Sequence, residues 1–230
     1  MNRIVLHHHT GLGDHFICNG LVHALAERHG GVDLITKKHL VKTIEHLYED
    51  WPEIKVIPVN DEFLDSELYA KEQQSVIHRV GFGNCDFNNF ETSFYEQVGL
   101  DPMFEYDNFR LPKEMLGSEN FYTKIIETLG KGYIFIHNVS SYKSFDLKID
   151  STLPSHIASK EDTDDVLDYV DTICNAKEVH VINSGLNNLV FQLYYLNMTK
   201  GKIFFHNARK LEDGGIPVKL PEGVEVVQYE

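Results

Sequence analysis

The chain has 230 residues, of which 42% are hydrophobic, and its 35 Asp and Glu residues outnumber its 21 Lys and Arg residues to give a formal charge of −14. A chain of this size accommodates one large domain or two smaller ones, on a prior of about 100–200 residues per domain. The acidic balance argues against general nucleic-acid binding, which depends on Lys and Arg to neutralise phosphates. We therefore expect a folded protein that has no nucleic-acid partner.

The sequence also argues against a membrane-spanning protein and against a small protein held together by disulfides. No apolar run approaches the roughly 18 residues that a membrane span requires, and the apolar start at 3–6 is too short for the core of a signal peptide. The three cysteines, Cys18, Cys85 and Cys174, are odd in number and lack the spacing of a metal site. We expect reduced thiols in a cytoplasmic protein without a transmembrane segment.

Short β-branched runs alternate with helical stretches through the first half of the chain. This alternation predicts an α/β fold with parallel sheets. The predicted strands are 3–9, 32–37, 54–59 and 76–80, and the predicted helices are 15–29, 40–48 and 90–98. The stretch from Gly99 to Pro112 is predicted to be a linker, because glycine and proline end the preceding helix.

The same alternation restarts after the predicted linker. Helices are expected at 118–129, 163–175 and 186–196, and strands at 133–137, 178–183, 202–206 and 224–227. We therefore predict two Rossmann-like lobes, 1–112 and 113–230, with an interlobe cleft. Ligands of open α/β sheets bind outside the carboxyl ends of the strands, so the loops after the strands are the candidate sites.

The turn at 10–15 joins the first strand to a helix through two glycines, Gly11 and Gly13, followed by Asp14. Glycines allow the backbone to approach a ligand closely, and the N–H groups of a new helix favour negative charge. A carboxylate in this turn repels phosphate but can take a proton from a hydroxyl, which makes Asp14 a candidate general base. The structural alternative is a helix N-cap. Phe16 stands where a dinucleotide fingerprint has its third glycine, which disfavours a nicotinamide or flavin enzyme.

Three consecutive histidines precede this turn. Strand alternation places His7 and His9 on one face and His8 on the other, so at most two of them converge with Asp14 or His15. Two interpretations stay open: histidines at a strand end that form local hydrogen bonds or line a polar cleft, or a metal-dependent hydrolase that uses His7, His9 and Asp14.

Two turns of the second half are suited to bind phosphate. In the turn after the strand 178–183, Ser184 can cap the next helix and Gly185 permits close approach, so the helix N-terminus offers an anion site. In the loop that follows His137, Ser140 and Lys143 can contact phosphate, with the lysine acting as a point charge. The alternatives are an ordinary capped helix and a solvated lysine.

The turn 10–15 and the later turn at 183–185 together resemble the GT-B class of glycosyltransferases. The nearest resemblance is to heptosyltransferase-like enzymes of glycosyltransferase family 9, whose signatures are a Gly-x-Gly-Asp turn and an Asp-Ser-Gly turn. The resemblance implies a compact GT-B-like fold, with a glycan-type acceptor held by the first lobe and a nucleotide-sugar donor held by the second. It also implies an inverting transfer that uses Asp14 as the base and requires no metal and no further cofactor.

The resemblance places Ser184, Gly185 and Lys143 at the donor diphosphate, and we expect the other candidate residues to contact the two substrates as follows. Donor contacts are Gly11, Gly13, His137, Ser140, Lys143, Ser184, Gly185 and Asn188, and acceptor contacts are His9 and His15. Asn183 stands where the family has Asp, and Asn188 lies near the position of a family histidine. These departures and the short second lobe keep a second interpretation open, a catalytically silent protein that binds sugar or nucleotide as a partner in glycan assembly.

Overall fold

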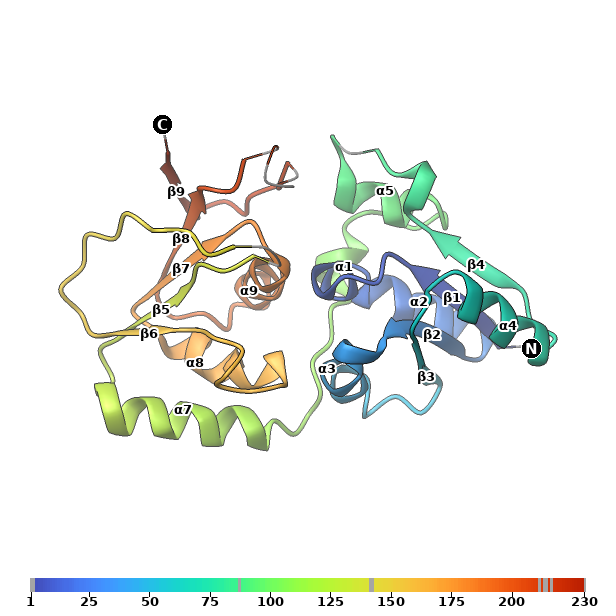
Figure 1. Cartoon of the computed structure of the whole chain (residues 1–230), viewed down its shortest axis with the longest axis horizontal. Coiled ribbons are helices and arrows are strands. Elements are labelled where there is room, and N and C mark those ends of the chain that lie inside the picture. Colours follow the sequence, from blue (N-terminus) through green and yellow to red (C-terminus); the bar gives the residue numbers. More distant parts are fainter. Residues whose placement is uncertain are drawn as a thin grey trace. The chain divides into compact units, whose positions relative to one another are not determined.

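The computed structural model describes residues 3–86, 88–140, 143–210, 212, 215 and 217–229 (Figure 1). The chain divides into two compact units, Met1–Lys113 and Glu114–Glu230. Each unit has its own parallel β-sheet with helices packed on it, which confirms the predicted α/β class.

The first unit contains a four-stranded parallel sheet of order β3-β2-β1-β4. Its strands are β1 (Ile4–His8), β2 (Val32–Lys37), β3 (Ile54–Val59) and β4 (Ile77–Val80). Its α-helices are α1 (Leu12–Ile17), α2 (Asn19–His29), α3 (Val41–Leu47), α4 (Leu64–Glu72), α5 (Phe90–Glu96) and α6 (Phe104–Asp107), with short 3₁₀ turns η1 (Lys38–Leu40) and η2 (Phe82–Asn84). The edge strand β3 includes the exposed Pro58, which lies in register with Thr36 of β2.

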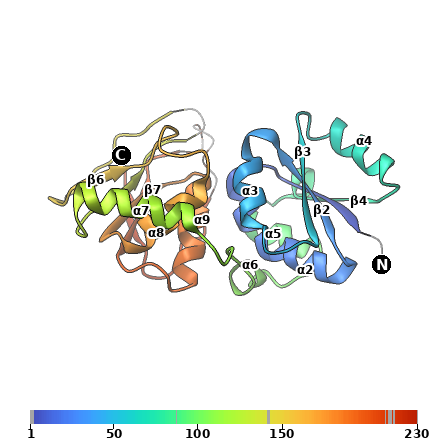
Figure 2. The ribbon, with the colours of Figure 1, turned by 90° about the horizontal axis from the view of Figure 1, so that it is seen from below.

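Helices lie against both faces of the first sheet, as the view from below shows (Figure 2). On one face, Ala70 of α4 packs with Val5, Ile35 and Ile57 in a buried cluster. On the other face, α1 and α2 cover the sheet, and His15 of α1 reaches Thr36 of β2. Every residue of β1 is buried, as expected for an inner strand covered on both sides. The carboxyl end of β1 therefore lies between the carboxyl ends of its neighbours β2 and β4.

The second unit contains a five-stranded parallel sheet of order β6-β5-β7-β8-β9. Its strands are β5 (Ile134–His137), β6 (Ser155–Ile157), β7 (Glu178–Ile182), β8 (Lys202–Asn207) and β9 (Glu225–Gln228). Its helices are α7 (Leu116–Leu129), α8 (Val170–Asn175) and α9 (Gly185–Tyr195), with a 3₁₀ turn η3 (Val166–Tyr169) before α8. Aromatic side chains fill its core: the Tyr133 hydroxyl donates to the carbonyl of Thr172 at 2.7 Å, and the rings of Phe191 and Phe205 lie 6.1 Å apart.

Several predicted elements need correction. The helix expected at 15–29 is two helices, α1 and α2, because the backbone at Cys18 (φ −82°, ψ 2°) departs from helical geometry between them. The helix expected at 163–175 begins only at η3, and the predicted linker 99–112 contains α6. The sequence patterns did not predict α4 or β6.

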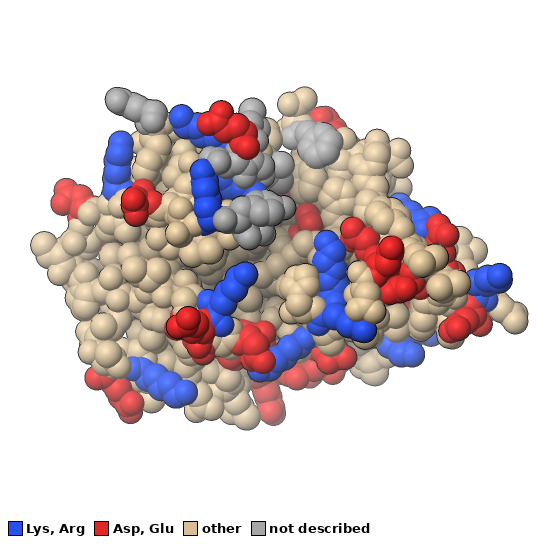
Figure 3. Space-filling model, viewed as in Figure 1, with Lys and Arg blue, Asp and Glu red and all other residues tan. Residues whose placement is uncertain are grey.

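Charges of both signs are distributed over the protein. On the face shown in Figure 3, Lys and Arg side chains are interspersed with Asp and Glu side chains. Within the described part of the chain, no helix is sufficiently long and apolar to cross a membrane.

Candidate active site

Asp14 lies in α1, just beyond the carboxyl end of β1, and its side chain is partly exposed. The backbone N–H of Gly11 donates a 3.2 Å hydrogen bond to Oδ2 of Asp14. Crowding by the surrounding protein removes water from the carboxyl group and raises its pKa to about 6, although the Gly11 hydrogen bond and the charge of Lys37 oppose this shift. The group is thus a carboxylate of unusual basicity at the end of the sheet where ligands bind.

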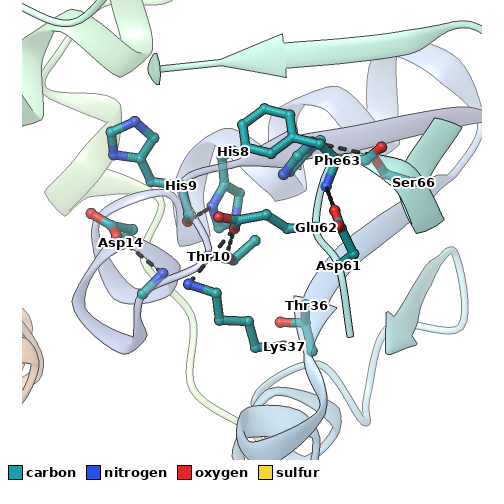
Figure 4. A network of polar contacts seen from close by, with 12 residues as sticks. His8, His9, Thr10, Asp14, Thr36, Lys37, Asp61, Glu62, Phe63 and Ser66 are labelled. Atoms are coloured by element: carbon teal, nitrogen blue, oxygen red, sulfur yellow. Dashed lines mark hydrogen bonds and ion pairs between the residues drawn. The ribbon is translucent and has the colours of Figure 1, made fainter. Parts of the chain in front are cut away.

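A second carboxylate lies in the same region and was not predicted from the sequence. Glu62 follows β3, and its Oε2 accepts a hydrogen bond from the Thr10 hydroxyl and lies 3.7 Å from Nζ of Lys37 (Figure 4). The negative charge of Glu62 contributes to the raised pKa of Asp14. The sequence showed that Glu62 follows a predicted strand, which marks it as a possible site residue. Its position beside Lys37 and Thr10 depends on the strand order β3-β2-β1.

His9 is held in place by the chain that follows β4. The backbone N–H of Phe82 donates to Nε2 of His9 at 2.6 Å, so Nε2 carries no proton in this arrangement. The ring also packs edge-on against Phe82 and Phe94, with centroids at 4.8 and 5.5 Å. Burial lowers the pKa of His9 below its ordinary value. His9 is partly exposed, so a role in acceptor binding stays a prediction.

His15 does not face a ligand, contrary to the expected acceptor contact. Its side chain is fully buried, its Nε2 lies 2.6 Å from the Thr36 hydroxyl, and its ring packs on His8 at 4.6 Å. Burial lowers the pKa of His15 far below its ordinary value, which keeps the imidazole neutral. His15 therefore connects α1 to β2 inside the protein.

The histidine run does not form the metal site of the hydrolase interpretation. His7 and His9 do share a face of the sheet. However, Nδ1 of His7 lies 3.4 Å from the Ser66 hydroxyl on α4, and Nε2 of His9 accepts a hydrogen bond from the backbone N–H of Phe82. Across the described ranges, no group of three or more His, Cys, Asp or Glu side chains is arranged to hold a metal ion. The geometry gives the hydrolase interpretation no support.

In the second unit, the turn after β7 is closed by its own side chains. Oδ1 of Asn187 accepts a 2.7 Å hydrogen bond from the backbone N–H of Ser184, and the Ser184 hydroxyl lies 3.1 Å from Nδ1 of His137. Burial lowers the pKa of His137 to about 4, so it is neutral near pH 7. The structure thus brings His137 and Ser184 together, as expected for one site, but His137 supplies no positive charge.

Positive charge at this end of the second sheet comes from other residues. Lys143 is exposed, and its Nζ lies 4.9 Å from the centre of the Phe145 ring. Its carbonyl accepts hydrogen bonds from the Ser140 hydroxyl at 3.1 Å and from the Ser140 backbone N–H at 2.8 Å. Arg209, which the sequence patterns did not reveal, donates from Nη1 to the carbonyl of Asn183 at 3.0 Å. Ser141, in the same predicted loop, lies outside the described residues.

The remaining predicted donor contacts lie in two separate places, at the start of α9 and in the turn that follows β1. Gly185 is the first residue of α9 and is partly exposed, and Asn188 accepts a 3.0 Å hydrogen bond from Nδ2 of Asn187. In the first unit, Gly11 is partly exposed, whereas Gly13 is buried within α1. No described contact of these four residues assigns them to a donor, and that role stays a prediction.

Comparison with solved structures identifies the architecture. A glycosyl transferase family 9 structure from Veillonella parvula matches 99% of this chain and 85% of its own, with a TM-score of 0.56 and 9% identity. ADP-heptose LPS heptosyltransferase II of Escherichia coli matches 99% of this chain and 90% of its own, with a TM-score of 0.55 and 10% identity. The chain has a GT-B-like fold.

A third structure agrees with this assignment over part of its length. The iron-containing dodecameric glycosyltransferase TibC of enterotoxigenic E. coli matches 89% of this chain and 57% of its own, with a TM-score of 0.51 and 14% identity. No protein-family model and no curated protein sequence matches the chain. At these identities the likeness establishes the fold, and the chemistry must be argued from the residues of this chain.

Proposed function

We propose that the protein is a glycosyltransferase that moves a sugar from a nucleotide-sugar donor to a hydroxyl of a glycan-type acceptor. The proposal rests chiefly on Asp14, a partly exposed carboxylate with a pKa raised to about 6 at the carboxyl end of the first sheet. Such a group is ionised in most molecules at pH 7 and is more basic than an ordinary Asp, as a general base should be.

In the proposed reaction, Asp14 removes the proton of the acceptor hydroxyl while the hydroxyl oxygen attacks the anomeric carbon of the donor sugar. The bond from that carbon to the donor diphosphate breaks, and its electron pair leaves with the diphosphate. Attack from the opposite side inverts the configuration. The proposal assigns the acceptor to the first unit.

The proposal assigns the donor to the second unit. Lys143, Arg209 and the N-terminus of α9 supply positive charge and N–H groups that can stabilise a leaving diphosphate without a metal ion. Of the predicted donor contacts, the Ser184 hydroxyl can donate to a phosphate oxygen in the tautomer in which Nδ1 of His137 carries the proton, and Gly185 leaves the backbone accessible.

The proposal is tested by measuring nucleotide binding and sugar transfer together. UDP, GDP and ADP are titrated calorimetrically, and hydrolysis and transfer are followed with UDP-, GDP- and ADP-sugars. We expect one nucleotide to bind, and we expect Asp14→Asn to bind it equally but to transfer about 10²- to 10⁴-fold more slowly. Glu72→Gln, at an exposed position on α4, is the control. Failure of all three nucleotides to bind, or unchanged transfer by Asp14→Asn, would contradict the proposal.

A second candidate is a silent protein that binds sugar or nucleotide without transfer. One observation favours it: the backbone N–H of Ser184, which a donor phosphate could use, is already bound by Oδ1 of Asn187. Hydrolysis of a nucleotide-sugar in the absence of acceptor separates the two candidates, since any rate that exceeds the uncatalysed one excludes the silent protein.

A further inference from the structure

The turn that connects β3 to α4 is held by carboxylates other than Glu62. Oδ1 of Asp61 accepts hydrogen bonds from the backbone N–H groups of Phe63 and Leu64 at 3.0 and 2.9 Å. Oδ2 of Asp65 accepts from those of Asn60 and Asp61 at 2.8 and 3.1 Å. The local backbone donors are therefore satisfied without Glu62, and the turn presents Glu62 and Phe63 in a defined geometry.

Glu62 keeps capacity for a ligand. Its contacts with Thr10 and Lys37 are both made by Oε2, and among the described residues Oε1 has no hydrogen-bond partner (Figure 4). The side chain of Glu62 is 28% exposed, and that of Lys37 is 39% exposed. An ionised carboxylate only accepts hydrogen bonds, so its natural ligand is a hydroxyl or another donor.

Phe63 provides an exposed aromatic surface directly beside this carboxylate. It is 47% exposed, yet its ring is fixed by edge-on packing on His7 at 5.3 Å and by contact with Phe82 at 5.2 Å. The Arg79 guanidinium lies over the ring, 6.0 Å from its centre, and the part of the ring that stays exposed offers an apolar surface at little cost in side-chain entropy. Pyranose rings have one face of C–H groups and a rim of hydroxyls, and this pair of residues is complementary to both.

The charge around Glu62 selects against acidic ligands. Lys37 is paired with Glu62, and Arg79, which lies over the Phe63 ring, is paired with Glu67 at 2.9 Å. Asp14 and the exposed Asp61 add negative charge nearby. The coupling of Glu62 to Asp14 is seen in the raised pKa of Asp14. A second anion brought to this group would meet like charge, which disfavours its binding.

We propose that Glu62 and Phe63 form an acceptor subsite for an uncharged sugar, in which Oε1 of Glu62 accepts from sugar hydroxyls and the Phe63 ring packs on the C–H face. This inference rests on the proposed function and names the class of its acceptor. It also gives Thr10 and Lys37 a positioning role, since both hold Oε2 and thereby direct Oε1 outward.

The subsite is tested on the full chain with methyl glycosides of glucose, galactose, mannose and N-acetylglucosamine, and with methyl glucuronide and glucose 6-phosphate as acidic probes. Binding is followed by saturation-transfer NMR and by backbone amide shifts. At least one neutral glycoside should bind and shift the resonances of residues 60–65, with weaker binding of both acidic probes. Absence of neutral-sugar binding, or tighter binding of an acidic probe, would overturn the inference.

Variants assign the binding to the two side chains. Two variants should each lower the affinity for the neutral glycoside about tenfold. Glu62→Gln has an amide oxygen that can still accept from Thr10, and Phe63→Leu keeps apolar bulk but loses the ring. Glu72→Gln and Leu68→Ala, at exposed positions on α4, should bind the glycoside as the parent does. Equal affinity of the parent and the two subsite variants would refute the subsite.

A separate measurement distinguishes failure of the subsite from failure of the proposed function. Nucleotide-sugar hydrolysis without acceptor is measured in the parent and should be unchanged in Glu72→Gln, which lies outside the subsite. If hydrolysis is present but neutral sugars do not use residues 60–65, the subsite is refuted while the transferase proposal stands. If nucleotides are neither bound nor hydrolysed, the transferase proposal fails, and with it the acceptor role of the subsite.

Discussion

The backbone N–H of Gly11 donates to the carboxylate of Asp14, and the absence of a side chain on Gly11 leaves the space that this carboxylate occupies. A Cβ atom at position 11 would lie 2.6 Å from Oδ2 of Asp14, much closer than two such atoms approach each other. The glycine thus both orients the acid and makes room for it.

Gly11→Ala is expected to displace the Asp14 carboxylate while the fold remains intact, because the atom in conflict is the end of a side chain that can rotate. A displacement of about 1 Å at a reacting group can lower a rate about 10²-fold, and we expect a loss of this order in transfer. Thermal unfolding and steady-state kinetics measure the two effects. Gly83→Ala, where a Cβ would meet nothing within 4 Å, is the control. Unchanged transfer by Gly11→Ala would show that the position of Asp14 is unimportant.

Asp14→Asn is expected to stabilise the first unit at pH 7. The pKa of Asp14 is about 6 in the folded protein, against 3.8 for the carboxyl group in the unfolded chain. Between these pH values the folded state binds more protons than the unfolded state, so the stability falls as pH rises. Two pKa units correspond to a ceiling of about 3 kcal/mol, and we expect a gain of about 1–3 kcal/mol from the uncharged amide.

The stability of Asp14→Asn is measured by urea unfolding with the fluorescence of Trp51, the only tryptophan, which lies in the first unit. The difference from the parent should disappear near pH 4, where Asp14 is protonated in the folded protein. Glu72→Gln should show no comparable gain. A destabilised Asp14→Asn at pH 7 would mean that the carboxylate is paired more strongly than the structure indicates.

Sugar transfer is expected to rise with pH and to reach half of its plateau near pH 6, because the base must be ionised to accept the hydroxyl proton. The Glu62→Gln variant should shift this midpoint downward, since the negative charge of Glu62 contributes to the raised pKa of Asp14. The measurement is kcat/KM from pH 4.5 to 8 for both proteins, with Glu72→Gln as control. A flat profile would contradict the assignment of Asp14 as the base.

Acid is expected to destabilise the first unit through its buried histidines. Burial lowers the pKa of His8 from 6.5 to about 4, so below pH 6.5 the unfolded chain binds more protons and stability falls toward pH 4. This direction is opposite to that of Asp14.

The contribution of His8 is measured by comparing unfolding at pH 7.5 and pH 5 through Trp51. His8→Asn, whose amide can still donate to the His9 carbonyl, should lessen the loss of stability between these pH values by about 2 kcal/mol. His39→Asn, at an exposed position, removes a histidine without altering the core. An equal pH dependence in His8→Asn and the parent would exclude His8 as the cause.

The sequence was sufficient to predict most strands, because their signal is local. Strands β2 and β3 were predicted with the observed bounds, since Val, Ile and Leu recur in each run between clear breaks. Helix α4 was missed because Leu64 and Leu68 point to solvent, so its apolar residues do not follow the period of a buried face. The break at Cys18 was also missed, because an apolar period continues across α1 and α2.

The candidate site was predictable only where one segment of chain determines it. The strand-to-helix turn placed Asp14 at the end of the sheet, as the position of such turns in α/β folds requires. The burial of His15 depends on Thr36, and the placement of Glu62 depends on the order of three strands. Such contacts join distant parts of the sequence, and no local pattern contains them.

Pro58 affects how the first sheet meets other chains. It lies on the exposed edge strand β3. Proline has no amide hydrogen, so a foreign strand that paired along this edge would lack one bond of its ladder. Pro58 therefore makes this edge a poorer template for pairing with a strand of another molecule, whereas a threonine or valine at this position would restore the missing backbone donor.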